Sequence, residues 1–439
     1  MNRRAMQSQK VRTTLMPIES PASRPTNVRP TSVRPNRAGR RTGLLGGVAA
    51  LTLASCASDA PQDTWAPEGR YAQDIHNLQW PIFLIAGIVG LIVFVVIAYV
   101  VVKFKARGQP IPEQSHGNAL VEYVFIAIPA LLLAGIAVPT VAGVISLNDT
   151  DDADCVVNVT GQQWWWEYDY PVDADGNICG FAPTGEAAPI ITSGQMVIPV
   201  DAKVVIRGTS RDVIHSFWVP KLNGKRDMVP GRLHTWNFHA NQPGIYAGQC
   251  AEFCGLSHAN MRMEIVALDD ADFQTWLDNQ LEPYQSPEAG TLAAKGEETF
   301  IAQCSRCHQI DGLTDADGEL IVSAPEQFVW SGAAPNLTNL MTRNTFAGAT
   351  WDLVTEDRRQ QVWEASPEQF GELYLEGVTA DTLNEIDLKE WLRNAPEKKP
   401  MYADPENLEA TDGKVRGMPY LALSEDQINE LVAYLTERK

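Results

Sequence analysis

The chain has 439 residues, a formal net charge of −19 at pH 7 and a sequence pI near 4.8. This length exceeds that of one ordinary domain, and two or three domains are expected. The acidic balance argues against nucleic acid as a partner and suits a basic protein partner, because opposite charges steer the encounter. Six of the seven cysteines follow residue 150, and four of these form two tight motifs, which indicates cofactor ligation rather than a disulfide framework.

Residues 1–55 are predicted to be an export leader. A basic cluster precedes a short apolar run from Leu44 to Ala54, which is too short to span a bilayer. The stretch LASC, ending at Cys56, also resembles a bacterial lipoprotein cleavage box, in which Cys56 would carry the lipid. A plain signal peptide with an incidental cysteine is the alternative.

Two uncharged apolar runs predict a transmembrane hairpin over residues 75–148. The first extends from Pro81 to Val102, and the second from about Tyr123 to Leu147. The loop between them carries three basic residues and therefore faces the cytoplasm of a bacterial inner membrane. Both ends of the chain, and everything after residue 148, would then lie on the periplasmic side. A pair of buried core helices is the alternative.

Glu122 lies at the cytoplasmic start of the second apolar run. An ionisable side chain at this position is a candidate for proton uptake or for contact with a partner. The alternative is a carboxylate solvated at the mouth of a helix.

Residues 149–280 predict an all-β, cupredoxin-like sandwich. Short runs rich in valine, isoleucine, tyrosine and tryptophan alternate with turn residues, as is typical of a sandwich or barrel. His215 lies in one such run, and a cysteine-rich loop follows it by just over thirty residues.

That loop, GQCAEFCGLSHANM at residues 248–261, has the spacing C-x-x-x-C-x-x-x-H-x-x-M. The spacing matches no zinc finger, whereas thiolate, thioether and imidazole ligands together favour copper. A distant histidine joined to a Cys…His…Met loop is typical of blue-copper sites, and a second cysteine allows two thiolates to bridge two metals. A disulfide between Cys250 and Cys254 is the competing interpretation.

Residues 281–290 are predicted to be a linker, and residues 291–439 an all-α cytochrome c domain. Cys304-Ser305-Arg306-Cys307-His308 has the attachment signature of c-type haem, with two thioethers and a histidine on the iron. Met418, which precedes an amphipathic terminal segment, is preferred as the second axial ligand. Met341 and Met401 are the other candidates. The stretch 313–382 exceeds what a minimal cytochrome needs.

Three motifs, CAEFCGLSHANM, DVIHSF and QWWWEY, closely resemble subunit II of cytochrome c oxidase. The resemblance covers roughly residues 70–270 and implies a dinuclear Cu(A) centre. Its implied ligands are His215, Cys250, Cys254, His258, Met261 and the backbone carbonyl of Glu252. The Glu252 carboxylate is further implied as a ligand of magnesium shared with subunit I.

The same resemblance implies that Trp164 receives electrons from cytochrome c and that Glu122 opens a proton pathway. Subunits I and III of the oxidase are the implied partners, with a soluble or membrane-bound cytochrome c as donor. One departure is Gln162, which replaces the histidine of the family's G-H-Q-W. Asp212, Asp227 and Arg232 match family positions near the subunit interface, with no sharper role assigned.

The predicted function is therefore that of subunit II of a proton-pumping cytochrome c oxidase with its own c-type haem. A quinol oxidase subunit would lack the copper ligands, and nitrous oxide reductase would add a histidine-rich propeller. A membrane-anchored electron-transfer protein serving another terminal reductase is the alternative. The sequence does not decide the state of Cys155 and Cys179, which form either a structural disulfide or two separate buried thiols.

Overall fold

The computed structural model describes residues 60–438 apart from 109, 111, 112, 115, 316 and 322–333. The predicted leader and the lipidation candidate Cys56 lie outside the described residues.

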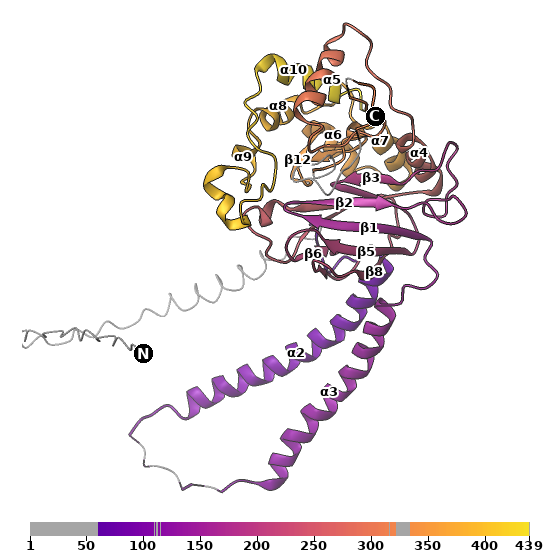
Figure 1. The fold of residues 1–439 in the computed structure, drawn as a ribbon. Helices are drawn as coiled ribbons and strands as arrows, with labels where there is room; N and C mark the ends of the chain where they lie inside the picture. The colour runs from indigo at the N-terminus through magenta and orange to yellow at the C-terminus, as the bar shows by residue number, and fades with distance from the viewer. Residues whose placement is uncertain are drawn as a thin grey trace, which may run out of the picture. The chain divides into compact units, whose positions relative to one another are not determined.

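The two apolar runs form the long helices α2 (Arg70–Lys103) and α3 (Ala119–Leu147) (Figure 1). Helix α2 begins before the predicted hairpin boundary at residue 75 because the polar segment ahead of Pro81 is also helical. The side chain of Asn118 caps α3 by accepting bonds from the amides of Leu120 and Val121.

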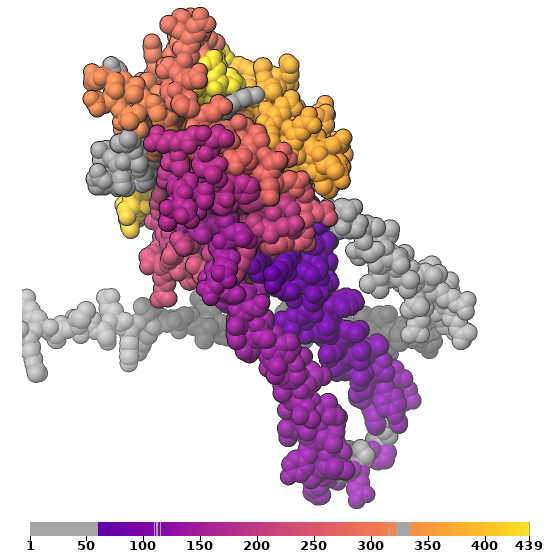
Figure 2. All heavy atoms as spheres, turned by 90° about the vertical axis from the view of Figure 1, so that its right-hand side faces the viewer, coloured from indigo at the N-terminus to yellow at the C-terminus, as the bar shows by residue number. Residues whose placement is uncertain are grey.

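Figure 2 shows both helices projecting from the rest of the described chain. Large apolar side chains are exposed over most of their length. Their most apolar windows have mean hydropathies of 3.1 and 2.4, and none of those residues is buried. An apolar surface of this extent is stable in lipid rather than in water. The exposure argues against the alternative of buried core helices and fits a membrane protein.

The predicted sandwich is confirmed as two five-stranded sheets, ordered β3-β2-β1-β5-β8 and β4-β10-β9-β6-β7 (Figure 1). The first sheet comprises β1 (Cys155–Gln162), β2 (Trp165–Tyr170), β3 (Ile190–Ser193), β5 (Val204–Ser210) and β8 (His234–Phe238). The second comprises β4 (Gln195–Pro199), β6 (His215–Trp218), β7 (Arg226–Met228), β9 (Gly244–Cys250) and β10 (Arg262–Leu268).

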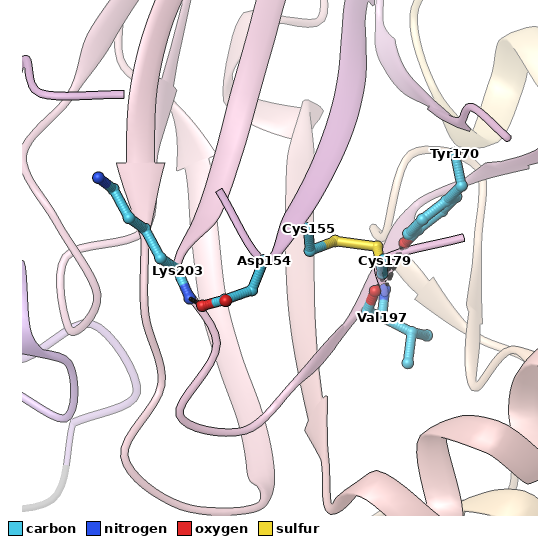
Figure 3. Close-up of a disulfide and its surroundings, with 6 residues drawn as sticks. All are labelled: Asp154, Cys155, Tyr170, Cys179, Val197 and Lys203. Atoms are coloured by element: carbon cyan, nitrogen blue, oxygen red, sulfur yellow. Dashed lines mark hydrogen bonds between the residues drawn. A yellow bond between two sulfur atoms is a disulfide. The ribbon is translucent and has the colours of Figure 1, made fainter. Parts of the chain in front are cut away.

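Large aromatic side chains fill the space between the two sheets. Trp166 on β2 meets Phe217 on β6 edge to face, with ring centroids 4.9 Å apart. The buried hydroxyl of Tyr170 donates to the carbonyl of Val197 and accepts from its amide, at 2.9 and 2.8 Å (Figure 3). This pair joins β2 to β4 and therefore ties one sheet to the other.

Cys155 and Cys179 form a disulfide (Figure 3). It joins the first residue of β1 to the loop that follows β2 and closes a segment with a sequence separation of 24. The question that the sequence left open is therefore resolved in favour of the bridge, which suits an oxidising compartment.

The cytochrome region is built on α5 (Leu292–Gln303), which crosses the terminal helix α10 (Glu425–Leu435). Gly296 allows this crossing because a side chain there would collide with the Glu430 carbonyl and with Tyr434. Ser424 and Gln427 form a capping box that fixes the start of α10. The remaining elements are η2 (Leu340–Thr342), β11 (Thr345–Phe346), β12 (Trp351–Asp352), α6 (Glu356–Trp363), α7 (Pro367–Leu375), α8 (Glu385–Arg393), α9 (Ala395–Lys398) and η3 (Pro405–Thr411).

The described part of the long stretch 313–382 packs against the sandwich. Phe370 and Tyr374 on α7 share a core cluster with helix α4 (Asp270–Gln280), which follows β10. Arg343 donates to the Ser193 hydroxyl at 3.0 Å, and the Arg359 guanidinium lies 3.5 Å from the Glu264 carboxylate. The extra length therefore serves as an interdomain contact.

Candidate copper and haem sites

Strand pairing brings His215 next to the cysteine-rich loop. β6 pairs with β9 in antiparallel fashion, with Phe217 opposite Cys250, and β9 ends where the loop begins. His215, two residues before Phe217, is fully buried in the same sheet. The histidine and the loop are thus joined across 35 residues by the register of the sheet.

The side-chain ligand atoms of His215, Cys250 and Cys254 lie within 4.8 Å of one another. The two sulfurs are 3.8 Å apart, and the His215 Nδ1 lies 3.9 Å from the Cys250 Sγ. The remaining predicted ligands border the same two sulfurs. The Glu252 carbonyl lies 3.2 Å from the Cys250 Sγ, and His258 Nδ1 and Met261 Sδ lie 3.5 and 3.8 Å from the Cys254 Sγ.

Asp212 holds His215 in place. Its carboxylate lies 2.9 Å from the His215 Nε2, which leaves Nδ1 facing Cys250. Burial, the largest single effect, lowers the pKa of His215, but the hydrogen bonds and charges of Asp212 and Cys250 together raise that pKa overall. The carboxylate therefore orients the ring as outer-shell partners of metal-bound histidines do. From the sequence, Asp212 was assigned only a place near the subunit interface.

The contact with the Cys254 thiol lowers the pKa of Cys250. The contact therefore favours a thiolate at Cys250, which is the form that binds metal. A buried cluster of soft sulfur and imidazole donors fits copper. The cysteines are not joined as a disulfide, which removes the competing interpretation of the loop.

Trp164 lies directly against the cysteine-rich loop of residues 248–261, which we call the copper loop. Its indole Nε1 donates to the Cys254 carbonyl at 3.0 Å, and Gln163 donates to the same oxygen at 2.7 Å. The Trp164 side chain is only 2 % exposed because the ring of Tyr402, from the cytochrome region, packs on it at 5.1 Å between centroids. No sequence pattern predicted this contact between Tyr402 and Trp164.

The haem-attachment motif follows the end of α5. Cys304 and Cys307 are free thiols, and the His308 amide bonds to the Cys304 carbonyl at 2.9 Å. The His308 Nδ1 lies 2.8 Å from the Pro335 carbonyl, and a backbone carbonyl is a common second partner of a metal-binding histidine. Burial lowers the pKa of His308, which keeps the imidazole in its neutral, ligating form. These residues fit a covalently attached haem.

The three candidate methionines occupy different surroundings. Met341 is fully buried in the helical core, and its amide bonds to the Arg438 carbonyl at 2.8 Å. Met401 is buried in the core cluster of the sandwich and contacts Gly417. Met418 is half-buried and packs against both the sandwich core and the helical core. Met418 stays the preferred axial ligand as a prediction.

The remaining predicted residues differ in their exposure. Glu122 is exposed in the first turn of α3. The Glu252 side chain is also exposed, although its carbonyl faces Cys250. Asp227 lies on β7, and Gln162 is buried at the end of β1.

Family models for the transmembrane and periplasmic domains of cytochrome c oxidase subunit II match residues 62–142 and 155–268, and a cytochrome c model matches residues 293–439. The chain is 33% identical, over 297 residues, to cytochrome c oxidase subunit 2 of Alkalihalophilus pseudofirmus, an alignment that covers 65% of this chain and 82% of that protein. The chain belongs to the cytochrome c oxidase subunit 2 family.

This subunit 2 chain is also similar to other proteins. The Bacillus subtilis cytochrome c oxidase subunit 2 is 29% identical over 348 residues, covering 74% of this chain and 88% of that one. The periplasmic domain of subunit II from Bradyrhizobium japonicum is 30% identical and covers 30% of this chain and 96% of that one, with a TM-score of 0.26. The matched domains imply copper binding in the sandwich and haem binding in the cytochrome region.

Proposed function

We propose that this chain is the electron-accepting subunit of a proton-pumping haem-copper oxidase that reduces oxygen to water. In this proposal a periplasmic cytochrome c gives electrons to the cytochrome region, which passes them to the copper loop and on to subunit I. The observation that carries the proposal is the convergence of His215, Cys250 and Cys254 within 4.8 Å.

The proposed copper centre is dinuclear Cu(A), which accepts and releases one electron at a time. Cys250, Cys254, His215 and His258 would hold the two coppers. Met261 and the Glu252 carbonyl would complete the set. Asp212 would keep the His215 ring from turning, and burial of the two cysteines would exclude water from the sulfurs.

The proposed haem c is a one-electron carrier held by Cys304, Cys307 and His308, with Met418 on its other face. Burial raises the pKa of the Cys304 thiol to about 12. Cys304 therefore stays a neutral thiol before attachment.

The loops that carry the copper ligands also present an apolar surface. Ile214 precedes His215 and is 44% exposed, while Phe253 and Leu256 in the copper loop are 76% and 48% exposed. Exposed apolar groups of this size favour a protein partner. In the proposal this partner is subunit I, with which the Glu252 carboxylate would share magnesium.

The proposal extends to the membrane. Helices α2 and α3 would cross the bacterial inner membrane twice, with the Lys103–Arg107 side in the cytoplasm. Glu122 would then open a proton pathway on that side, and subunit III would be a further partner. An export leader with lipidation at Cys56 belongs to the same proposal.

The test is the EPR spectrum of the full chain, purified in detergent and loaded with copper and haem. A hyperfine pattern from one electron shared between two copper nuclei would support the proposal. A single-copper pattern, or no copper signal beside an intact haem spectrum, would favour a membrane-anchored cytochrome serving another reductase.

A further inference from the structure

Lys399, which directly follows α9, is buried without a carboxylate partner. It is only 3 % exposed, and its Nζ donates to the backbone carbonyls of Trp164 at 2.8 Å and of Ala347 at 2.7 Å. Among the residues that the structure describes, the titratable group that acts on this amine is the Cys254 thiol. Lysine is almost never fully buried unless its charge is paired, so a role beyond packing is expected here.

The bonds of Trp164 connect the Lys399 amine to the copper loop. The Trp164 carbonyl accepts from Lys399, while the Trp164 indole donates to the Cys254 carbonyl at 3.0 Å. A single residue therefore separates the amine from one of the proposed copper ligands. Solvent and salt screen a charge much less at a buried position than at the surface, so the charge of Lys399 acts strongly on its surroundings.

The preceding residue, Lys398, provides a comparison within the same segment. Its Nζ lies 2.6 Å from the Asp387 carboxylate and 2.6 Å from the Glu390 carboxylate. These two negative charges offset the charge of Lys398, whereas Lys399 donates to backbone carbonyls, which carry no net charge. The two neighbouring lysines therefore differ in how much of their charge is left to act on the copper loop.

We propose that Lys399 raises the reduction potential of the copper centre by placing a buried positive charge beside the copper loop. In the proposed transfer one electron leaves the haem iron, which is oxidised, and enters the copper centre, which is reduced. A nearby ammonium group stabilises the added negative charge, so the equilibrium shifts toward reduced copper. This inference rests on the proposed function, because it requires a redox-active copper at the loop.

The experiment is a redox titration of the full chain, purified in detergent and loaded with copper and haem, with the copper state followed by EPR. Burial lowers the pKa of Lys399 to about 7, so the titration is made at pH 6, where the amine keeps its proton. In Lys399→Met we expect the ratio of reduced to oxidised copper at a fixed electrode potential to fall about tenfold. This change corresponds to a midpoint potential lower by about 59 mV.

Lys398→Met is the matched control, because it removes the same charge one position away. We expect it to change the ratio of reduced to oxidised copper by less than about twofold, since two carboxylates already offset that charge. An equal fall of the potential in both variants would overturn the proposal, because the copper would then respond only to the net charge of the chain.

Two further variants separate the charge of Lys399 from its hydrogen bonds. Lys399→Gln keeps an N–H donor without the charge, and we expect it to lower the potential as Lys399→Met does. Lys399→Arg keeps the charge, and we expect a potential close to that of the wild type. A wild-type potential in Lys399→Gln would overturn the proposal, and so would a wild-type potential in Lys399→Met. An unchanged copper hyperfine pattern shows in each variant that the site itself is intact.

Failure of this inference is distinguishable from failure of the proposed function. A dinuclear copper signal with equal potentials in the wild type and Lys399→Met would overturn the tuning by Lys399 and leave the proposed function standing. A single-copper signal in the wild type would overturn the proposed dinuclear centre. The same comparison of potentials would still decide the role of Lys399, because its charge acts on any redox metal held by the loop.

Discussion

The copper loop and the haem pocket reach their cofactors in opposite ways. The proposed copper donors His215, Cys250 and Cys254 come from two strands and a loop, yet the sheet register already places their ligand atoms within 4.8 Å of one another. Three of the haem donors lie within five consecutive residues, from Cys304 to His308, but the remaining axial ligand must come from a distant segment. The register of a sheet places residues that are far apart in the sequence next to one another. Helices joined by loops have no such register, so the identity of the second axial haem ligand is harder to predict.

The largest expected effect tests whether the two sites are independent. We expect His215→Asn to abolish dinuclear copper binding, because the removed imidazole is the only donor that β6 supplies among the proposed ligands. The haem absorbance should persist, since Cys304 lies in a separate core and Cys307 and His308 belong to the same motif. EPR and optical spectra of the same sample measure both. Loss of both signals together would mean that the contact between Tyr402 and Trp164 couples the folding of the two regions.

The second prediction concerns the less determined ligand. Met418→Ala should remove the absorbance band that reports a thioether on ferric haem, while Met401→Ala should retain it. The two methionines form a matched pair because their segments lie side by side. Tyr402 and Arg416 pair in an antiparallel bridge, and Met401 contacts Gly417. The opposite pattern would move the axial ligand to Met401.

The third prediction concerns the orientation of His215. Asp212→Ala should weaken copper binding by roughly 10- to 100-fold, because the imidazole loses the partner that fixes its ring. Competition with a copper chelator measures this affinity. Asp212→Asn, which keeps an acceptor oxygen, should recover part of the loss.

A matched control separates this effect from the interdomain contact. The Arg416 guanidinium lies 3.8 Å from the Asp212 carboxylate and comes from the cytochrome region. Arg416→Gln should leave the copper affinity within about twofold, because an ion pair this long and partly exposed contributes little. An equal loss in both variants would mean that docking, rather than the bond to His215, sets the affinity.

The sequence predicted most of the fold and the convergence of the copper ligands, because spacing and residue type report local chemistry. It did not predict that the Tyr402 ring packs on Trp164. It also did not predict that the buried Lys399 donates to the carbonyls of Trp164 and Ala347. A buried lysine that bonds two backbone carbonyls has no sequence pattern, since its partners lie 235 and 52 positions away. The disulfide stayed undecided for a related reason, because pairing depends on where a loop returns to β1.

The smallest expected effect concerns the contact between the long insertion and the sandwich. Glu264 on β10 is buried, accepts from Gln195 at 2.6 Å and lies 3.5 Å from Arg359 on α6. Burial raises the pKa of Glu264 above its ordinary value of 4.5, outweighing the attraction of Arg359. The folded chain therefore holds this proton at a higher pH than the unfolded chain does. The stability that Glu264 contributes is complete below pH 4.5 and is lost as the pH rises through the folded pKa.

Glu264→Gln removes this dependence because glutamine stays neutral at every pH. We expect the free energy of unfolding of the wild type, measured relative to the variant, to fall as the pH rises above 4.5. The slope should not exceed about 1.4 kcal/mol per pH unit, the limit for one proton. Denaturant unfolding of both proteins over this pH range, followed by tryptophan fluorescence, measures the difference. A relative stability that rises with pH would mean that the pair with Arg359 outweighs burial, and that the insertion is held to the sandwich by an ionised carboxylate.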